Sequence, residues 1–287
     1  MYFKYWGLRE RPFQNIADVR FAYLSEQHRE GLARLLYLVE EQKLGGTLVG
    51  PYGVGKSMII ELLAENVRGK IGERYLQFDA PLTGALSLAK QIVAHLGHTE
   101  TVYDISGALE ALQNHFTETN GGVAHLVLVI DEAQMLRASS DYEFLHLLCN
   151  MRMRRRDGSL GAPAITLLLV GHQDLVQHLA AEQSLAQRLQ LFWRLEPLNA
   201  RQCIEYVQHR VRASGGDIWI FDEGALAAVH EATQGVPRLI NNICDTALLI
   251  GCAMHAPRIT ADIMRQAIAE TQSPLLPPTV SPPGVPV

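Results

Sequence analysis

The chain has 287 residues, of which 48% are hydrophobic and 19% are charged, and its formal net charge is −5. This acidic balance excludes a protein that coats nucleic acid with its whole surface, although a local basic patch stays open. The four cysteines form no C-x-x-C pair, the first ten residues lack the apolar stretch of a secretory leader, and no apolar run approaches about 18 residues. We therefore expect a reduced, cytoplasmic protein without a membrane span.

The first 25 residues are rich in aromatic side chains and include Pro12, so they predict an irregular segment. Residues 25–43 then place apolar side chains at helical spacing after Ser25, a residue type that caps helix starts. His28 lies in the first turn of this predicted helix. Two interpretations of His28 stay open: an exposed histidine on the helix surface, or a side chain that lines the adenine pocket of a bound nucleotide.

The most specific motif follows a short apolar strand predicted at residues 47–50. Residues 50–57, GPYGVGKS, match G-x-x-x-x-G-K-[ST], and an amphipathic helix follows them. A glycine loop between strand and helix binds phosphate through backbone N–H groups at the positive end of the helix dipole. We predict that Lys56 contacts the outer phosphates of ATP and that Ser57 holds Mg²⁺. The predicted nucleotide contacts of this loop are Gly50, Pro51, Tyr52, Gly53, Val54, Gly55, Lys56, Ser57 and Met58.

Strands and helices then alternate along the chain. Apolar runs at residues 74–79, 125–131 and 164–171 predict further strands, and residues 84–97, 104–118 and 141–156 predict helices between them. This alternation is typical of a parallel sheet that is covered on both faces.

Two acids, Asp131 and Glu132, end the predicted central strand HLVLVI. Carboxylates at the end of a buried strand are costly unless they meet water, metal or substrate. We predict that Asp131 supports the Mg²⁺ beside Ser57 and that Glu132 is the general base that activates water. An ordinary acidic loop start is the alternative, and the preceding phosphate loop disfavours it.

Polar residues also follow the next predicted strand, where Gln173 or His172 would touch the terminal phosphate or its water. Gln173 is slightly preferred, and an ordinary polar loop is an equal alternative. Further along the chain, Arg188 or Arg194 would supply the arginine with which one ring subunit reaches its neighbour's nucleotide. A surface arginine is the alternative interpretation of both.

One basic cluster comprises Arg152, Arg154, Arg155 and Arg156. The predicted helix over residues 141–156 would end in it, and a solvated helix C-terminus is the preferred interpretation. The alternative is a surface for duplex DNA or for an acidic partner.

Beyond residue 197 the pattern is helical only, with predicted helices at residues 199–215, 221–235, 236–255 and 259–272. Arg238 begins the third of these, where it could contact bound nucleotide or make a surface ion pair. The last 14 residues contain six prolines and no charge, which predicts a loose tail.

These residues resemble one family. The segments MYFKYWGLRERPF, RFAYLSEQHREGLARL, GPYGVGKS, VIDEAQ, LLLVGHQDL, LAQRL and GVPRLINNICDTALL look like those of the ExeA/GspA-type AAA+ ATPases, in that order, over residues 1–273. The family serves bacterial envelope machines such as type II secretion and pilus biogenesis, and it is similar to the TniB, TnsC and MuB transposition ATPases. The resemblance implies an arginine finger at Arg188, a nucleotide sensor at Arg238, and another at Gln173 or His172. It also implies that the strand before Asp131 lies directly beside the phosphate-loop strand.

The expected fold class is therefore α/β. We expect a P-loop AAA+ (ASCE) parallel-sheet nucleotide-binding domain at residues 1–197, an all-α lid at 198–273 and a proline-rich disordered tail at 274–287. The expected function is ATP hydrolysis by a self-associating ring or filament that acts on a protein partner in envelope, secretion or pilus assembly. The alternative is an ATP-dependent DNA-binding regulator of transposition that forms rings or filaments on DNA. A nucleotide-gated scaffold with negligible hydrolysis is disfavoured by the intact Asp131–Glu132 pair.

Overall fold

The computed structural model describes residues 2–68, 75–80, 84–97, 102–117, 125–155 and 157–271. The chain divides into two compact units. One unit is formed by residues 17–196, and the other combines residues 1–16 with the chain from residue 197 onward. The proline-rich tail predicted at 274–287 and Arg156 lie outside the described residues.

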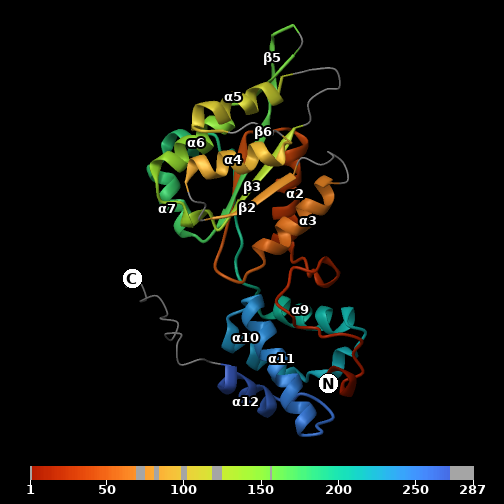
Figure 1. The fold of residues 1–287 in the computed structure, drawn as a ribbon. Helices are drawn as coiled ribbons and strands as arrows, with labels where there is room; N and C mark the ends of the chain where they lie inside the picture. Colours follow the sequence, from red (N-terminus) through yellow and green to blue (C-terminus); the bar gives the residue numbers. More distant parts are fainter. Residues whose placement is uncertain are drawn as a thin grey trace, which may run out of the picture. The chain divides into compact units, whose positions relative to one another are not determined.

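The unit of residues 17–196 is built on a five-stranded parallel sheet in the order β2-β3-β6-β1-β7 (Figure 1). Its strands are β1 Gly45–Val49, β2 Tyr75–Asp79, β3 Leu126–Asp131, β6 Ile165–Gly171 and β7 Leu191–Arg194. Every residue of β1, β3 and β6 is buried, as expected for central parallel strands.

The strand order corrects one expectation. Strand β3, which carries Asp131, does not lie beside β1, because β6 pairs with both of them. All seven residues of β6 are buried and most of them are apolar, so the central position suits this strand. Since all these strands are parallel, their carboxyl ends still meet at one edge of the sheet.

Helices cover both faces of this sheet (Figure 1). On one face, Val127 and Val129 of β3 pack with the helices α2 and α3. On the other face, Leu126, Leu128 and Ile130 pack with α4 to α7. Successive strand residues point to opposite faces, so one apolar strand supplies both cores. The helices are α2 Glu26–Glu40, α3 Lys56–Arg68, α4 Ala85–His95, α5 Ile105–His115, α6 Ser139–Cys149, α7 Asp174–Ala181 and the short α8 Gln183–Ala186.

The basic cluster does not end a helix, contrary to the preferred interpretation of the sequence. Helix α6 stops at Cys149, and β4 Arg152–Arg154 pairs antiparallel with β5 Leu160–Pro163. The turn between these strands uses Gly158 at φ +80°, and its N–H donates to the carbonyl of Arg155 at 2.9 Å. Glycine adopts this conformation at little cost, which favours a hairpin over continued helix.

Within the described residues 197–271, the second unit contains four long helices: α9 Ala200–Ala213, α10 Glu223–Thr233, α11 Pro237–Ala253 and α12 Ala261–Thr271. Asn199 and Gln202 form a capping box at the start of α9, and Pro237 occupies the first turn of α11. Short helical turns occur at α1 Tyr2–Tyr5, η1 Val19–Phe21, η2 Ala133–Met135 and η3 Ile218–Ile220.

The N-terminal segment packs within this second unit, whereas the sequence placed it with the nucleotide-binding domain. The indole N–H of Trp6 donates to the carbonyl of Leu248 at 2.9 Å, and buried Arg210 donates to the carbonyl of Pro12 at 2.6 Å. These hydrogen bonds connect segments that are far apart along the chain, which local sequence patterns do not report.

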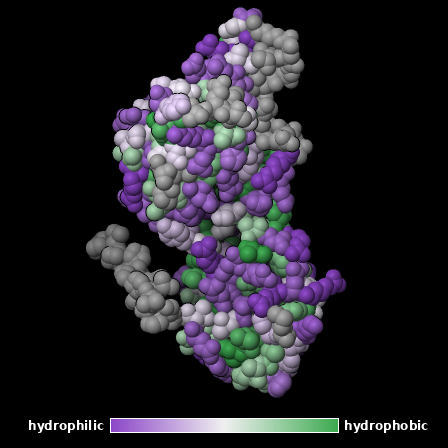
Figure 2. Space-filling model, viewed as in Figure 1, coloured by the Kyte–Doolittle hydropathy of each residue, from purple (hydrophilic) through white to green (hydrophobic). Residues whose placement is uncertain are grey.

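The surface of the second unit shows green hydrophobic patches among purple (Figure 2). Its exposed large apolar side chains include Trp219, Leu239, Leu249 and Met254. Among the described residues, none of the helices combines the length and the apolar character that crossing a bilayer requires.

Candidate functional site

The phosphate loop connects β1 to α3 and has the backbone that its glycines predict. Gly53 and Gly55 adopt φ values of +81° and +107°, which disfavour side chains. A Cβ on Gly50 would lie 2.6 Å from the carbonyl oxygen of Leu195. Val54 is buried, Tyr52 and Ser57 are exposed, and Met58 is half-buried. The loop is therefore tightly curved and lies at the start of a 13-residue helix, where its backbone N–H groups are suited to bind phosphate.

Lys56 lies buried on the inner side of this loop. Its Nζ donates to the carbonyl oxygens of Gly50 at 2.9 Å and Pro51 at 3.0 Å. The Nζ atom also lies 5.8 Å from the centroid of the Tyr52 ring. A cation held by two loop carbonyls is placed where an incoming phosphate oxygen would find it.

Asp131 and Glu132 lie at the carboxyl end of β3, as the sequence predicted. Asp131 is buried, and its Oδ1 accepts the N–H of Glu132 at 2.8 Å. The pKa of Asp131 is raised, mainly by burial and also by the charges of Glu132 and Asp79, while the backbone hydrogen bond and the charge of Lys56 oppose this shift. A divalent cation beside this carboxylate would offset the cost of burying its charge.

Glu132 has an unusual backbone for a residue with a side chain. Its φ of 51° and ψ of 33° are left-handed, and conformations of this type cost on the order of 1 kcal/mol or more. Such strain is concentrated at functional sites. Glu132 is half-buried and is the N-cap residue of the turn η2, which follows β3.

Sequence reasoning missed Gln134. Its Nε2 donates to Oε2 of Glu132 at 2.5 Å, and its Oε1 accepts the backbone N–H of His172 at 2.9 Å. The Tyr52 hydroxyl lies 3.5 Å from Nε2 of Gln134, and its ring stacks on the His172 ring at 4.7 Å and 11°. Gln134 lies in the VIDEAQ segment, which contributed to the family resemblance, but the sequence pattern assigned no role to this residue.

The structure places His172 in this cluster, whereas Gln173 is exposed at the N-cap of α7. Nδ1 of His172 lies 3.1 Å from Oδ2 of Asp174. His172 is thus the residue at the end of β6 that contacts the phosphate loop, through Tyr52. The sequence pattern slightly favours Gln173 over His172 as the phosphate contact. The sensor role of either residue stays a prediction.

His28 is buried beneath the phosphate loop, so it is not the exposed helix histidine that was one interpretation. Its Nε2 lies 3.0 Å from the carbonyl oxygen of Val54, and its Nδ1 lies 2.6 Å from Oγ of Ser25. Since a carbonyl can only accept, Nε2 carries the proton. Burial lowers the pKa of His28. The side chain supports the loop from behind, and its contact with adenine stays a prediction.

We expect stability to fall in mild acid because of this histidine. A lowered pKa means that the folded state disfavours the charged ring, so its stability contribution is complete above about pH 6.5 and is lost below that value. Urea unfolding at pH 7.5 and pH 5.5 should show a smaller acid loss in His28→Gln than in the wild type. Buried His125, whose pKa burial also lowers, accounts for a remainder.

The control is His95→Gln, because His95 is exposed on α4. An acid loss that is the same in His28→Gln and in the wild type would contradict the assignment of a buried neutral ring.

The predicted arginines occupy three different settings. Nε of Arg188 donates to Oδ1 of Asn150 at 3.0 Å, and the side chain is half-buried. Arg194 is 47% exposed, and its Nε lies 3.9 Å from Glu196. Arg238 lies in the first turn of α11, in the second unit, and is exposed. The roles of all three in catalysis stay predictions.

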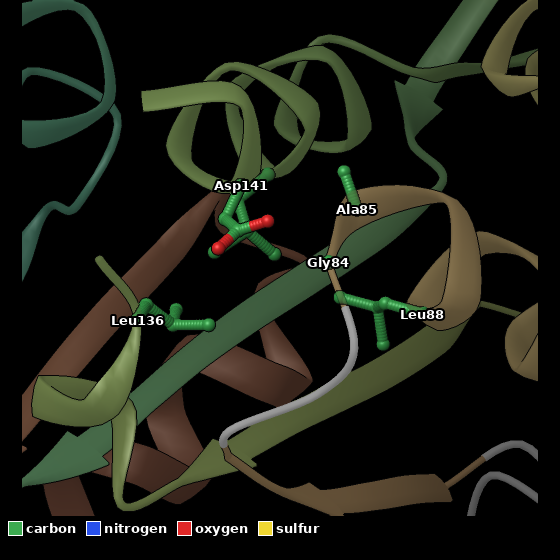
Figure 3. A pocket seen from close by; sticks show the side chains of 6 residues that line it. Gly84, Ala85, Leu88, Leu136 and Asp141 are labelled. Carbon is green, nitrogen blue, oxygen red and sulfur yellow. The ribbon is translucent and has the colours of Figure 1, made fainter. Parts of the chain in front are cut away.

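A small pocket is lined by residues outside the phosphate loop (Figure 3). Asp141 and Leu136 face Gly84, Ala85 and Leu88 across it. Oδ1 of Asp141 is buried and has no hydrogen-bond partner among the described residues. The space suits about one water molecule, and no predicted nucleotide contact lines it.

Comparisons with known proteins find relatives of this chain in sequence and in fold. A family model described as an AAA domain matches residues 39–179. The chain is 29% identical over 265 residues to General secretion pathway protein A of Aeromonas hydrophila, and the match covers 90% of this chain and 46% of that protein. The chain therefore spans less than half the length of that relative.

Solved structures share the fold at low sequence identity. The ORC2 protein of Aeropyrum pernix, in ADPNP–ADP complexes, is 16% identical with a TM-score of 0.67, over 92% of this chain and 72% of that one. Cdc6p of Pyrobaculum aerophilum is 19% identical with a TM-score of 0.68, over 89% and 71%. Drosophila ORC bound to DNA is 22% identical with a TM-score of 0.65, over 92% and 65%. At these identities the likeness concerns the fold alone.

Proposed function

We propose that this chain, which carries an AAA domain and is related to General secretion pathway protein A, binds Mg·ATP and hydrolyses it as an oligomeric switch. Its resemblance to the ExeA/GspA-type AAA+ ATPases is confirmed, as is the parallel-sheet α/β fold. One observation carries the proposal of hydrolysis. The buried Asp131 ends β3 and the half-buried Glu132 follows it, at the sheet edge where the phosphate loop, with buried Lys56, follows β1.

In the proposed mechanism, the loop N–H groups and Lys56 bind the phosphates. The Ser57 hydroxyl and the Asp131 carboxylate are suited to hold Mg²⁺, which when bound would neutralise charge on the phosphate oxygens. The donor set is all oxygen, which Mg²⁺ prefers, and Oδ2 of Asp131 is left after Oδ1 takes the N–H of Glu132. Glu132 then accepts a proton from the attacking water.

The direct test is release of inorganic phosphate from ATP by the wild-type chain. We expect turnover that depends on Mg²⁺ and stops when EDTA removes the metal. A rate of phosphate release per subunit that rises with protein concentration would support activation by a neighbouring subunit, for which Arg188 is the proposed contact. A chain that binds ATP but releases no phosphate at any concentration would contradict the ATPase proposal and favour a nucleotide-gated scaffold.

We also propose that the switch acts on a protein partner. A relative named for the general secretion pathway favours a protein partner in an envelope or secretion machine, reached from the cytoplasm. The acidic net charge of −5 is also easier to reconcile with a protein partner than with nucleic acid.

A second candidate function, ATP-dependent DNA binding, rests on the arginine hairpin β4–β5. Arg154 and Arg155 are exposed and Arg152 is half-buried, while Met153 packs toward the core. Alternation along β4 thus directs Arg152 and Arg154 to the face away from the core. The end of the unit that carries β5 is largely purple where it is not grey (Figures 1 and 2). One solved structure with this fold is of ORC bound to DNA.

The two candidates are separated by duplex DNA binding of the Glu132→Gln protein, measured by fluorescence anisotropy with and without Mg·ATP. The DNA candidate predicts ATP-dependent binding that weakens with salt. It also predicts that Arg154→Ala with Arg155→Ala lowers the salt slope by about one for each DNA phosphate that these arginines neutralise in the wild type. Arg201→Ala is the matched control, because its side chain is 88% exposed in the other unit. No binding at low salt, in protein that holds ATP, would leave the protein-partner candidate.

A further inference from the structure

Gln134 is a buried amide at the centre of the candidate site. It is 4% exposed and lies in the turn η2, two residues beyond Glu132. Buried amides are stable only when their donors and acceptors are paired. The hydrogen bonds of Gln134 therefore help to hold the site together, and its partners are residues of the proposed ATPase site.

The donor side of Gln134 acts on the general base. Nε2 donates to Oε2 of Glu132 at 2.5 Å, and a hydrogen bond to a carboxylate is about twice as strong as one between neutral groups. With Oε2 held, the carboxylate plane is fixed and Oε1 is the oxygen left to accept a proton from water. The same Nε2 lies 3.5 Å from the Tyr52 hydroxyl oxygen.

The acceptor side ties the same amide to the neighbouring strand. Oε1 takes the backbone N–H of His172, the first residue after β6, at 2.9 Å. The His172 ring in turn stacks on Tyr52 of the phosphate loop. One side chain thus connects the end of β3, the end of β6 and the phosphate loop.

The chain leaves room for this amide with a glycine. A Cβ built on Gly171 would collide with Oε1 of Gln134, and it would lie 3.3 Å from the Gln134 backbone nitrogen. Gly171 does not have a positive φ, so space rather than backbone conformation favours glycine here.

We propose that Gln134 is a positioning residue for hydrolysis: it holds the Glu132 carboxylate in the orientation that activates water, and it couples that orientation to His172 and to Tyr52 of the phosphate loop. The inference rests on the proposed ATPase function and adds a residue to it. Because Gln134 acts through Glu132, its loss should affect turnover and leave nucleotide affinity unchanged.

Two substitutions separate the two sides of the amide. Gln134→Met removes both hydrogen bonds at similar volume. Gln134→Glu keeps an acceptor for His172 but loses the donor and places a negative charge against Glu132. We expect kcat to fall by about 10- to 100-fold in both variants, with the larger loss in Gln134→Glu, while the affinity for a non-hydrolysable ATP analogue stays close to wild type in protein that still unfolds cooperatively.

A third variant reaches the same amide without changing it. Gly171→Ala should displace the Gln134 side chain and lower kcat in the same way. Gly107→Ala is its matched control, because a Cβ there meets Oδ1 of Asp104 at an ordinary 3.5 Å. This variant also keeps the test available if a substitution at position 134 destabilises the fold.

The decisive measurement is single-turnover hydrolysis in the Glu132→Gln background. Gln134→Met should cause no further loss there, because the base through which it acts is already gone. If the wild type hydrolyses ATP and Gln134→Met has the same kcat, or if the two losses add in the double variant, the inference about Gln134 is wrong while the ATPase proposal stands. Absence of turnover in the wild type would overturn the ATPase proposal and the inference with it.

Discussion

Replacement of Glu132 by glutamine is expected to abolish most ATP turnover while ATP binding persists. The amide cannot accept the proton of the attacking water, and general-base catalysis contributes roughly 10²- to 10⁴-fold to rate. The new amide would still offer an oxygen to Nε2 of Gln134, which holds Oε2 of Glu132 at 2.5 Å in the wild type, so the turn should keep its geometry. Phosphate release at saturating Mg·ATP measures the loss.

Binding is measured on the same protein with a fluorescent ATP analogue. The expected pattern is an unchanged Kd with a reduced kcat, the signature of an interaction made in the transition state. Hydrolysis by the Glu132→Gln variant at the wild-type rate would show that another group activates water, and the general-base assignment would then be wrong.

Replacement of Lys56 by alanine is expected to weaken ATP binding itself. Lys56 is a buried cation inside the phosphate loop, where its Nζ donates to Gly50 and Pro51. Truncation of one partner of a desolvated charge pair costs about 2 kcal/mol or more, which corresponds to roughly a 30-fold rise in Kd. Calorimetric titration with ATP and Mg²⁺ measures this change.

The control for Lys56→Ala is Lys90→Ala, which removes an exposed lysine from α4 and the same net charge. The variant protein must also unfold cooperatively, because alanine leaves two loop carbonyls without their donor. Wild-type affinity in folded Lys56→Ala would contradict the placement of the phosphates in this loop.

Local sequence alone was sufficient to predict much of the fold. The alternation of apolar runs and helical spacings predicted a parallel α/β sheet, and its strands β1, β2, β3 and β6 are found where the pattern placed them. The octet at residues 50–57 predicted a strand–loop–helix, and the glycines at 53 and 55 have the positive φ such a loop requires. These features depend on side-chain spacing and on backbone freedom, which neighbouring residues determine.

Two predictions differ from the structure for a physical reason: the helix end predicted at the arginine cluster, and the placement of the N-terminal segment in the nucleotide-binding domain. Residues 152–155 have helix-compatible side chains, but pairing between β4 and β5 and the turn at Gly158 override that preference. Residues 1–16 belong to the same unit as the chain from residue 197 onward, and Trp6 and Phe13 are buried there. Both outcomes depend on non-local contacts, whose energy no local window contains.

The sequence by itself determined the chemistry that is available: a phosphate loop with Lys56, and the acids Asp131 and Glu132 after a buried strand. Only the tertiary structure decided how those groups are held. It inserted β6 between β1 and β3, brought His172 rather than Gln173 to Tyr52, and placed Gln134 on Glu132. The reason is that residue type and spacing specify local conformation, whereas strand order and side-chain pairing follow from how the whole chain buries its apolar surface and satisfies its buried polar groups.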